Sequence, residues 1–308
     1  MNPLRARAEA VTLGTLAALV TALPAGGARR LGHALGELWF RLDAGHREVA
    51  RRNLEMALPG RSAGERREIA RAAFRHFGAV LVDLLRFPSY DAEEVAARVR
   101  IDGWENLENA LARGKGALLF TAHYGHWELA GLAQGFRGRP LDVVTRPLDN
   151  EWLERRLARA RRRSGNRVIH KRAAIRGILR ALREGRSVAL VIDQNFRDAG
   201  RVFVDFFGRP AATTPTLGVL AVRTGAPVLP VFSWPEADGR YRIEYRPEVL
   251  PVDTEDRAAD ALDLTRRCTG LIEAQIRARP EYWLWMHQRW RTRPETAGGS
   301  RAGGEVFA

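Results

Sequence analysis

A histidine and a glutamate lie five positions apart at the end of an apolar run. His123 directly follows residues 117–122, and Glu128 comes shortly after Gly125. An imidazole oriented by a carboxylate can take the proton of a hydroxyl group and so make its oxygen a nucleophile. These residues therefore indicate activation of an alcohol. We expect Glu128 to accept from Nδ1 of His123, which leaves Nε2 to take the proton.

The two side chains can meet only if the backbone turns between them. A continuous helix would place residues five apart on different faces, whereas Gly125 permits a turn. We expect a strand that ends at Ala122, His123 at its carboxyl end, and a helix that begins near Trp127. Ligands of open α/β sheets bind at the carboxyl ends of strands.

Two other interpretations of the pair remain open. His123, His126 and Glu128 could bind a metal, although the pattern His-Glu-x-x-His is absent. A His-x4-Glu spacing also arises by chance, in which case the histidine is structural. No Gly-x-Ser-x-Gly elbow accompanies the pair, and Cys268 is remote in sequence. We therefore favour direct attack by a substrate hydroxyl, without a covalent enzyme intermediate, a metal or another cofactor.

Further candidate residues follow other predicted strands. Arg146 comes after a short strand and could clamp a phosphate, or be one surface arginine among many. Asp193 and Gln194 follow another strand, where Asp193 could cap a turn or orient a substrate. The aromatic side chains of residues 203–215 favour core packing, with the wall of an acyl-chain tunnel as the functional alternative.

Three segments repeat a pattern of helix, glycine-containing turn and short strand. They cover residues 107–122, 175–192 and 217–232. The pattern predicts an α/β fold with a mostly parallel central sheet flanked by helices. Residues 142–145 and 240–246 are further strand candidates. Apolar and charged residues alternate in the second of these, which suggests an edge strand.

The chain divides into three regions by composition. Residues 1–95 are expected to form an N-terminal helical, membrane-associating region, which includes a helix over 68–87. Residues 96–294 are expected to form the α/β domain, with a late helix over 256–279. The glycine-rich residues 295–308 are expected to be a disordered tail.

Charge and the N-terminus point to anionic partners. The net charge is +14, and all but two of the 50 cationic residues are arginines, so the surface should attract polyanions. No nucleic-acid-binding signature is present. Residues 10–23 are apolar and end at Pro24, which is short for a bilayer-spanning helix. We expect a helix in the membrane interface, with a secretory signal or a helix packed on its own domain as alternatives.

Several short motifs occur in a fixed order along the chain. They are Arg51-Arg-Asn53-Leu-Glu-Met-Ala-Leu-Pro59, His123-x4-Glu128, Val143-Val-Thr-Arg146-Pro-Leu, Asp193-Gln194, Phe203-Val-Asp-Phe-Phe-Gly208 with Thr213-Thr214-Pro215, and Trp285-Met-His287-Gln-Arg289-Trp-Arg291. The His123-x4-Glu128 motif is shared by many glycerolipid acyltransferases, whereas the full ordered set of motifs is more specific. Over residues 31–293 the chain resembles the bacterial lipid A biosynthesis acyltransferases, the late lauroyl and myristoyl transferases.

The resemblance implies transfer of a fatty acyl group from acyl carrier protein to a hydroxyl of a membrane glycolipid, usually a lipid A precursor. It implies His123 as general base, Glu128 as its partner and Arg146 as a substrate-binding residue, with Asp193 and Gln194 near the site. It also implies the cytoplasmic face of the bacterial inner membrane. Related members acylate mannosylated phosphoinositides or other lipids, so the motifs leave the acceptor open.

Charge is consistent with these partners. An acidic carrier protein and an anionic membrane surface suit a chain of net charge +14, and no nucleic acid is implied. Two other classes of function remain: a non-catalytic basic protein that binds membranes or nucleic acid, and a metal-dependent hydrolase that uses His123, His126 and Glu128. Acyl transfer that depends on His123 and survives a chelator would exclude both.

Overall fold

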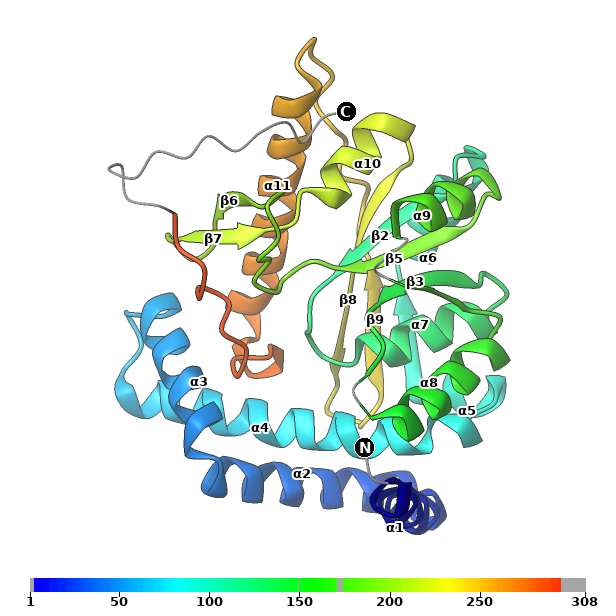
Figure 1. Ribbon diagram of the computed structural model, residues 1–308, viewed down its shortest axis with the longest axis vertical. Helices are drawn as coiled ribbons and strands as arrows, with labels where there is room; N and C mark the ends of the chain where they lie inside the picture. The colour runs from blue at the N-terminus through cyan, green and yellow to red at the C-terminus, as the bar shows by residue number, and fades with distance from the viewer. Residues whose placement is uncertain (1–2, 149, 171–173, 295–308) are drawn as a thin grey trace.

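A computed structural model describes residues 3–148, 150–170 and 174–294 (Figure 1). The tail that we expected to be disordered, residues 295–308, lies outside the described residues.

A central sheet organises the described part of the chain. Its order is β1-β9-β8-β2-β5-β3-β4, and β6 and β7 form a separate antiparallel pair. The strands are β1 (Val99–Asp102), β2 (Ala117–Thr121), β3 (Leu141–Thr145), β4 (Arg167–His170), β5 (Ser187–Val191), β6 (Val202–Asp205), β7 (Pro210–Thr213), β8 (Val228–Pro235) and β9 (Tyr241–Tyr245). The predicted β-rich runs therefore form strands, and β1, β4, β6 and β7 add to them.

The sheet is mostly parallel, as predicted. Strands β8, β2, β5, β3 and β4 run in one direction, whereas β9 is antiparallel to β8 and parallel to β1. The expectation that β9 lies at an edge was wrong, because β1 pairs along its outer side. The alternation of apolar and charged residues along β9 indicates that its two faces have different surroundings. It does not indicate whether another strand pairs with its edge.

Helices cover both faces of the sheet and continue into the N-terminal region. They are α1 (Pro3–Ala22), α2 (Ala25–Leu42), α3 (Ala44–Ala57), α4 (Ala63–Arg86), α5 (Ala92–Arg98), α6 (Trp104–Ala112), α7 (Trp127–Phe136), α8 (Glu151–Arg163), α9 (Ala174–Arg183), α10 (Thr216–Thr224) and α11 (Arg257–Ala278), with short 3-10 turns η1 (Phe87–Ser89) and η3 (Pro280–Tyr282). In Figure 1, α4 runs as a long rod along one end of the sheet, and α2 lies against its outer side.

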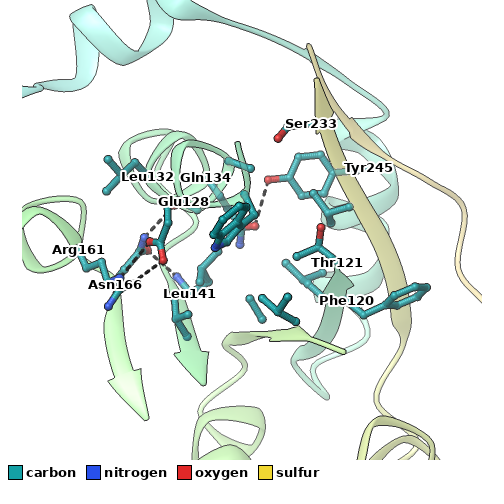
Figure 2. Close-up of a pocket in the computed structure, with 18 residues that line it drawn as sticks. Phe120, Thr121, Glu128, Leu132, Gln134, Leu141, Arg161, Asn166, Ser233 and Tyr245 are labelled. Carbon is teal, nitrogen blue, oxygen red and sulfur yellow. Dashed lines mark hydrogen bonds and ion pairs between the residues drawn. The ribbon is translucent and has the colours of Figure 1, made fainter. Parts of the chain in front are cut away.

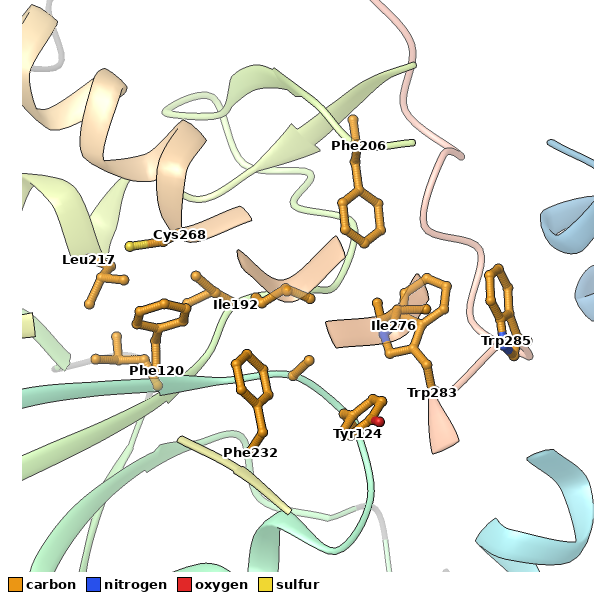
Figure 3. Close-up of a cluster of buried hydrophobic side chains, with 14 of the residues drawn as sticks. Phe120, Tyr124, Ile192, Phe206, Leu217, Phe232, Cys268, Ile276, Trp283 and Trp285 are labelled. Atoms are coloured by element: carbon orange, nitrogen blue, oxygen red, sulfur yellow. The ribbon is translucent and has the colours of Figure 1, made fainter. Parts of the chain in front are cut away.

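Strand β2 shows why its sequence is continuously apolar. Leu118 and Phe120 pack in one buried cluster with side chains of α9, α10 and α11, part of which Figure 3 shows. Ala117 and Leu119 pack in a second cluster with side chains of α6, α7 and α8. Because both faces of β2 are covered, polar residues have no place along it until the strand ends.

Close helix packing fixes α2 on α4. A Cβ atom added at Gly36 would lie 2.2 Å from the carbonyl oxygen of Phe74, and one at Gly32 would lie 2.4 Å from Cα of Ala79. Gly78 on α4 faces Gly32 across the contact, where an added Cβ would lie 2.3 Å from its carbonyl oxygen. Three glycines therefore let the two backbones approach to a distance that any side chain would prevent.

We expect Gly36→Ala to destabilise the protein by about 1–3 kcal/mol, because the new methyl group forces α2 away from α4. Gly26→Ala in the same helix is the matched control, since nothing lies within 4 Å of a Cβ at that position. Urea unfolding of both variants measures the difference. Equal free energies of unfolding for the two variants would contradict the packing described here.

The N-terminal segment divides where the sequence predicts. Helix α1 ends at Ala22, and Pro24 is the N-cap of α2. Within the described residues, no helix combines the length and the apolar character that crossing a bilayer requires.

Candidate active site

The structure pairs His123 with Asp193. Strands β2 and β5 are parallel neighbours in which Thr121 is opposite Val191, so His123 and Asp193 each lie two residues beyond the last paired position. Nδ1 of His123 is 2.8 Å from Oδ1 of Asp193, and the backbone N–H of His123 donates to Oδ2 at 2.9 Å. The carboxylate therefore holds both the imidazole and the backbone that carries it.

The carboxyl group of Asp193 is built to stay ionised. Its side chain is 2% exposed, and Nε1 of Trp283 donates to Oδ2 at 2.7 Å. Burial alone would raise the pKa of Asp193, but the charge of His123 and the hydrogen bonds from His123 and Trp283 outweigh it and hold the pKa below its usual value. A buried carboxylate on Nδ1 makes Nδ1 the donor and leaves the lone pair on Nε2. The His123 side chain is 21% exposed, so this nitrogen is accessible.

Glu128 does not take the place that we expected beside His123. It lies in the first turn of α7 and forms a two-pronged ion pair with Arg161 of α8, with Nη2–Oε1 at 2.6 Å and Nε–Oε2 at 3.2 Å. The Arg161 side chain is 6% exposed, and the Glu128 side chain 15%. The prediction that Nδ1 of His123 donates to Glu128 was therefore wrong. Asp193 accepts this hydrogen bond, because β5 lies beside β2 in the sheet and both strands end at the same level.

His126 has a third, separate partner. Its Nδ1 accepts from the backbone N–H of Leu129 at the start of α7, and Nε2 donates to Asp83 of α4 at 3.0 Å. The side chain is fully buried. His123, His126 and Glu128 thus engage three different groups and do not converge on a common point, which argues against the metal site that their spacing suggested.

The turn between β2 and α7 is held from several sides. Gly125 has φ +56°, and a Cβ there would lie 1.6 Å from the carbonyl oxygen of Ser233, so this position requires glycine. Its N–H donates to Tyr282 at 2.8 Å, and its carbonyl oxygen accepts from Nε2 of His76 at 3.0 Å. The N–H of His126 donates to Oγ of Ser233 at 2.9 Å. The catalytic candidate therefore sits on a fixed backbone.

Because of His76, the free energy of unfolding should depend on pH. Burial lowers its pKa from 6.5 to about 3, and only part of this is offset by the hydrogen bond to Gly125. Below pH 6.5 the imidazole of His76 therefore binds a proton in the unfolded chain, whereas in the folded chain it stays neutral down to about pH 3. We expect the free energy of unfolding to be level above pH 6.5 and to fall by up to about 1.4 kcal/mol per pH unit below it.

Urea unfolding between pH 7.5 and 5 measures this slope. His76→Gln keeps a donor for Gly125 and removes the titration, so the slope should become shallower. Some slope should remain, because burial also lowers the pKa of His287 to about 4. Identical slopes for the wild type and His76→Gln would show that His76 is not the buried neutral group described here.

The other predicted site residues lie at neighbouring strand ends. Arg146 is exposed and lies one residue beyond β3, which pairs with β5. Gln194 is also exposed, and its side-chain nitrogen lies 3.3 Å from Nε2 of His123. The structure thus brings Asp193 and Gln194 to His123, and it places Arg146 at the same edge of the sheet.

An apolar cavity lies beneath this edge, between the sheet and α7 (Figure 2). Its volume is about 50 Å³. Its lining includes Thr121, Trp127, Val143, Ala189, Val231 and Tyr245. Figure 2 shows the ion pair of Glu128 and Arg161 at one side and the hydrogen bond from Tyr245 to Gln134 at another. Each water needs roughly 10–15 Å³ of such space, so the cavity of this structure has room for only a few water-sized molecules.

Two of the aromatic residues of 203–215 belong to the core, and Phe203 is half-buried. Phe206 and Phe207 are buried and pack edge-on to one another and against Trp283, Trp285 and Trp290. They do not line the cavity of Figure 2. Their default interpretation, core packing, therefore holds for the structure.

Sequence reasoning missed the role of the C-terminal segment. The N–H of Leu284 donates to the carbonyl oxygen of His123 at 3.1 Å, and Trp283 supports Asp193. Asn53 of α3 holds this segment from the other side, since its amide donates to Trp285 and His287 at 2.7 and 2.8 Å. The motifs themselves were the available signal, because the segments with Asn53, His123, Asp193 and Trp285 all belong to the ordered set, and they meet at this site.

The fold and this site define an α/β protein with a buried carboxylate behind an accessible imidazole at the carboxyl edge of the sheet. Residues 8–292 match the family model of the bacterial lipid A biosynthesis acyltransferases. The chain therefore belongs to the lipid A biosynthesis acyltransferase family, as its motifs indicated, and it is an acyltransferase.

Named relatives agree with this assignment. A lipid A biosynthesis palmitoleoyltransferase of Escherichia coli K12 is 32% identical over 80% of this chain and 79% of its own length. A lipid A biosynthesis lauroyltransferase of the same organism is 30% identical over 90% and 89%. A phosphatidylinositol mannoside acyltransferase of Mycolicibacterium smegmatis is 27% identical over 79% of both chains.

Proposed function

We propose that this protein transfers a fatty acyl group from the thioester of acyl carrier protein to a hydroxyl group of a membrane glycolipid, a lipid A precursor. His123 is the general base and Asp193 is its partner. The observation that carries the proposal is the hydrogen bond from Nδ1 of His123 to the buried carboxylate of Asp193, which leaves Nε2 accessible as a base.

The chemistry follows from this arrangement. The hydroxyl oxygen of the acceptor attacks the carbonyl carbon of the thioester while Nε2 of His123 takes its proton. The carboxylate of Asp193 stabilises the imidazolium that forms and keeps the ring in one orientation. The imidazolium then returns the proton to the departing thiolate. The ion pair of Glu128 and Arg161 acts on this step only by fixing α7 against α8.

Substrate and membrane contacts are assigned from position and charge. Arg146 binds a phosphate group of the acceptor, because it is exposed at the end of the strand next to β5. The protein associates with the cytoplasmic face of the inner membrane through its N-terminal helices. On α2, Leu35, Leu38 and Leu42 are exposed at helical spacing, on a face beside the one whose glycines contact α4.

The named relatives differ in their lipid acceptors. Two named relatives act in lipid A biosynthesis, whereas a third is named for phosphatidylinositol mannoside. The second acceptor is therefore the alternative. The test incubates the purified protein with lauroyl-acyl carrier protein and either lipid, and detects the products by mass spectrometry. Acylation of the lipid A precursor supports the proposal, acylation of the mannoside supports the alternative, and transfer to neither overturns both.

A further inference from the structure

The lone pair of the base faces a side-chain amide. Asp193 makes Nδ1 of His123 the donor, so Nε2 can only accept. The side-chain nitrogen of Gln194 lies 3.3 Å from Nε2. An amide nitrogen only donates, and the amide oxygen would meet a second lone pair if the group were turned around. The amide of Gln194 therefore directs an N–H group at the position where a hydroxyl proton would be taken.

The backbone that carries this amide is fixed on both sides. The carbonyl oxygen of Gln194 accepts from Nη1 of Arg289 at 3.3 Å, and the N–H of Asn195 donates to Nε2 of His287 at 3.0 Å. Before it, Asp193 is held by His123 and Trp283. The Gln194 side chain, in contrast, is exposed. Hydrogen bonds thus hold the backbone at Gln194, and rotation about its side-chain torsions can turn the amide toward the reacting atoms.

Proton transfer changes what this amide can contact. When Nε2 takes the hydroxyl proton, it becomes a donor, and two N–H groups then face each other. At the same moment a negative charge develops on the carbonyl oxygen of the thioester. The amide of Gln194 therefore loses Nε2 as an acceptor just as the thioester oxygen becomes one. A donor directed at this oxygen lowers the activation barrier of acyl transfer.

We propose that Gln194 is a catalytic residue that donates to this oxyanion. The proposal rests on the proposed function. The acceptor oxygen bonds to the carbonyl carbon, its proton passes to Nε2, and the carbonyl π pair moves to the oxygen, which accepts from Gln194. When the carbonyl re-forms, the carbon–sulfur bond breaks, the thiolate leaves with the electron pair, and the imidazolium proton passes to sulfur.

The test compares kcat and KM of Gln194→Ala and Gln194→Glu with lauroyl-acyl carrier protein and the lipid acceptor. We expect Gln194→Ala to lower kcat by about 10²-fold or more and to leave KM within about twofold. Gln194→Glu should lose at least as much, since it sets a negative charge beside the oxyanion. Gln288→Ala is the matched control, because Gln288 is an exposed glutamine on the adjacent segment. Its kcat should be unchanged.

Three results would overturn the proposal. A Gln194→Ala enzyme as fast as the wild type, or faster, would mean that the amide only covers the base. An active Gln194→Glu enzyme would mean that position 194 offers an oxygen to the imidazolium. A change in KM alone would make Gln194 a binding residue. His123→Ala is measured in parallel: if it remains active, the proposed function is at fault, whereas an inactive His123→Ala beside a fully active Gln194→Ala refutes only this proposal.

Discussion

Replacing His123 with alanine is expected to lower the rate of acyl transfer by about 10²–10⁴-fold, the usual contribution of a general base. The loss should fall on kcat, because the proton transfer by His123 belongs to the chemical step. The fold should persist. Without the imidazole, the carboxylate of Asp193 still accepts from the backbone N–H of residue 123 and from Nε1 of Trp283.

The rate is measured with a labelled acyl-carrier-protein thioester and the lipid acceptor, and folding by circular dichroism. His46→Ala is the control, because His46 is exposed on α3 and far along the chain from the site. Full activity of His123→Ala would remove the base from the mechanism. An inactive His123→Ala that has also unfolded would be followed by His123→Gln, which retains a polar side chain at that position.

The second large effect separates the two candidate partners of the base. In Asp193→Asn, three donors compete for one amide oxygen: Nδ1 and the backbone N–H of His123, and Nε1 of Trp283. The amide nitrogen adds a further donor, so the favourable response is for Nδ1 to accept and for Nε2 to carry the proton. The base is then lost, and we expect activity to fall by about 10²-fold or more with a smaller loss of stability.

Glu128→Gln should behave differently. It removes the charge opposite the buried Arg161 and is expected to cost about 1–3 kcal/mol of stability. Its kcat per folded molecule should stay near that of the wild type. Steady-state kinetics and urea unfolding of both variants distinguish the cases. If Glu128→Gln were inactive but stable, and Asp193→Asn active, Glu128 would be the partner that its spacing first suggested.

Local sequence patterns predicted most of the elements around the site. The apolar run before His123 forms β2, and the expected helix at Trp127 is α7. The expected helix over 256–279 is α11, with Asp256 as its N-cap. Four strands escaped prediction. Strands β1 and β4 have four residues each and are partly exposed, so neither shows a clear period. Strands β6 and β7 lie around the aromatic segment 203–215, whose composition indicated core packing but no strand. The start of α4 was also missed, although Ser62 and Glu65 form a capping box.

Local patterns were enough to predict that a histidine follows a buried strand, that the chain turns at Gly125, and that a carboxylate lies in the first turn of the next helix. Burial, backbone conformation and helix periodicity act over a few residues, so each leaves a local trace. Which carboxylate meets the imidazole depends on the three-dimensional fold. Asp193 lies 70 positions along the chain and reaches His123 because β5 pairs with β2 in one register. That pairing depends on the packing of the whole sheet and its helices, which no short segment encodes.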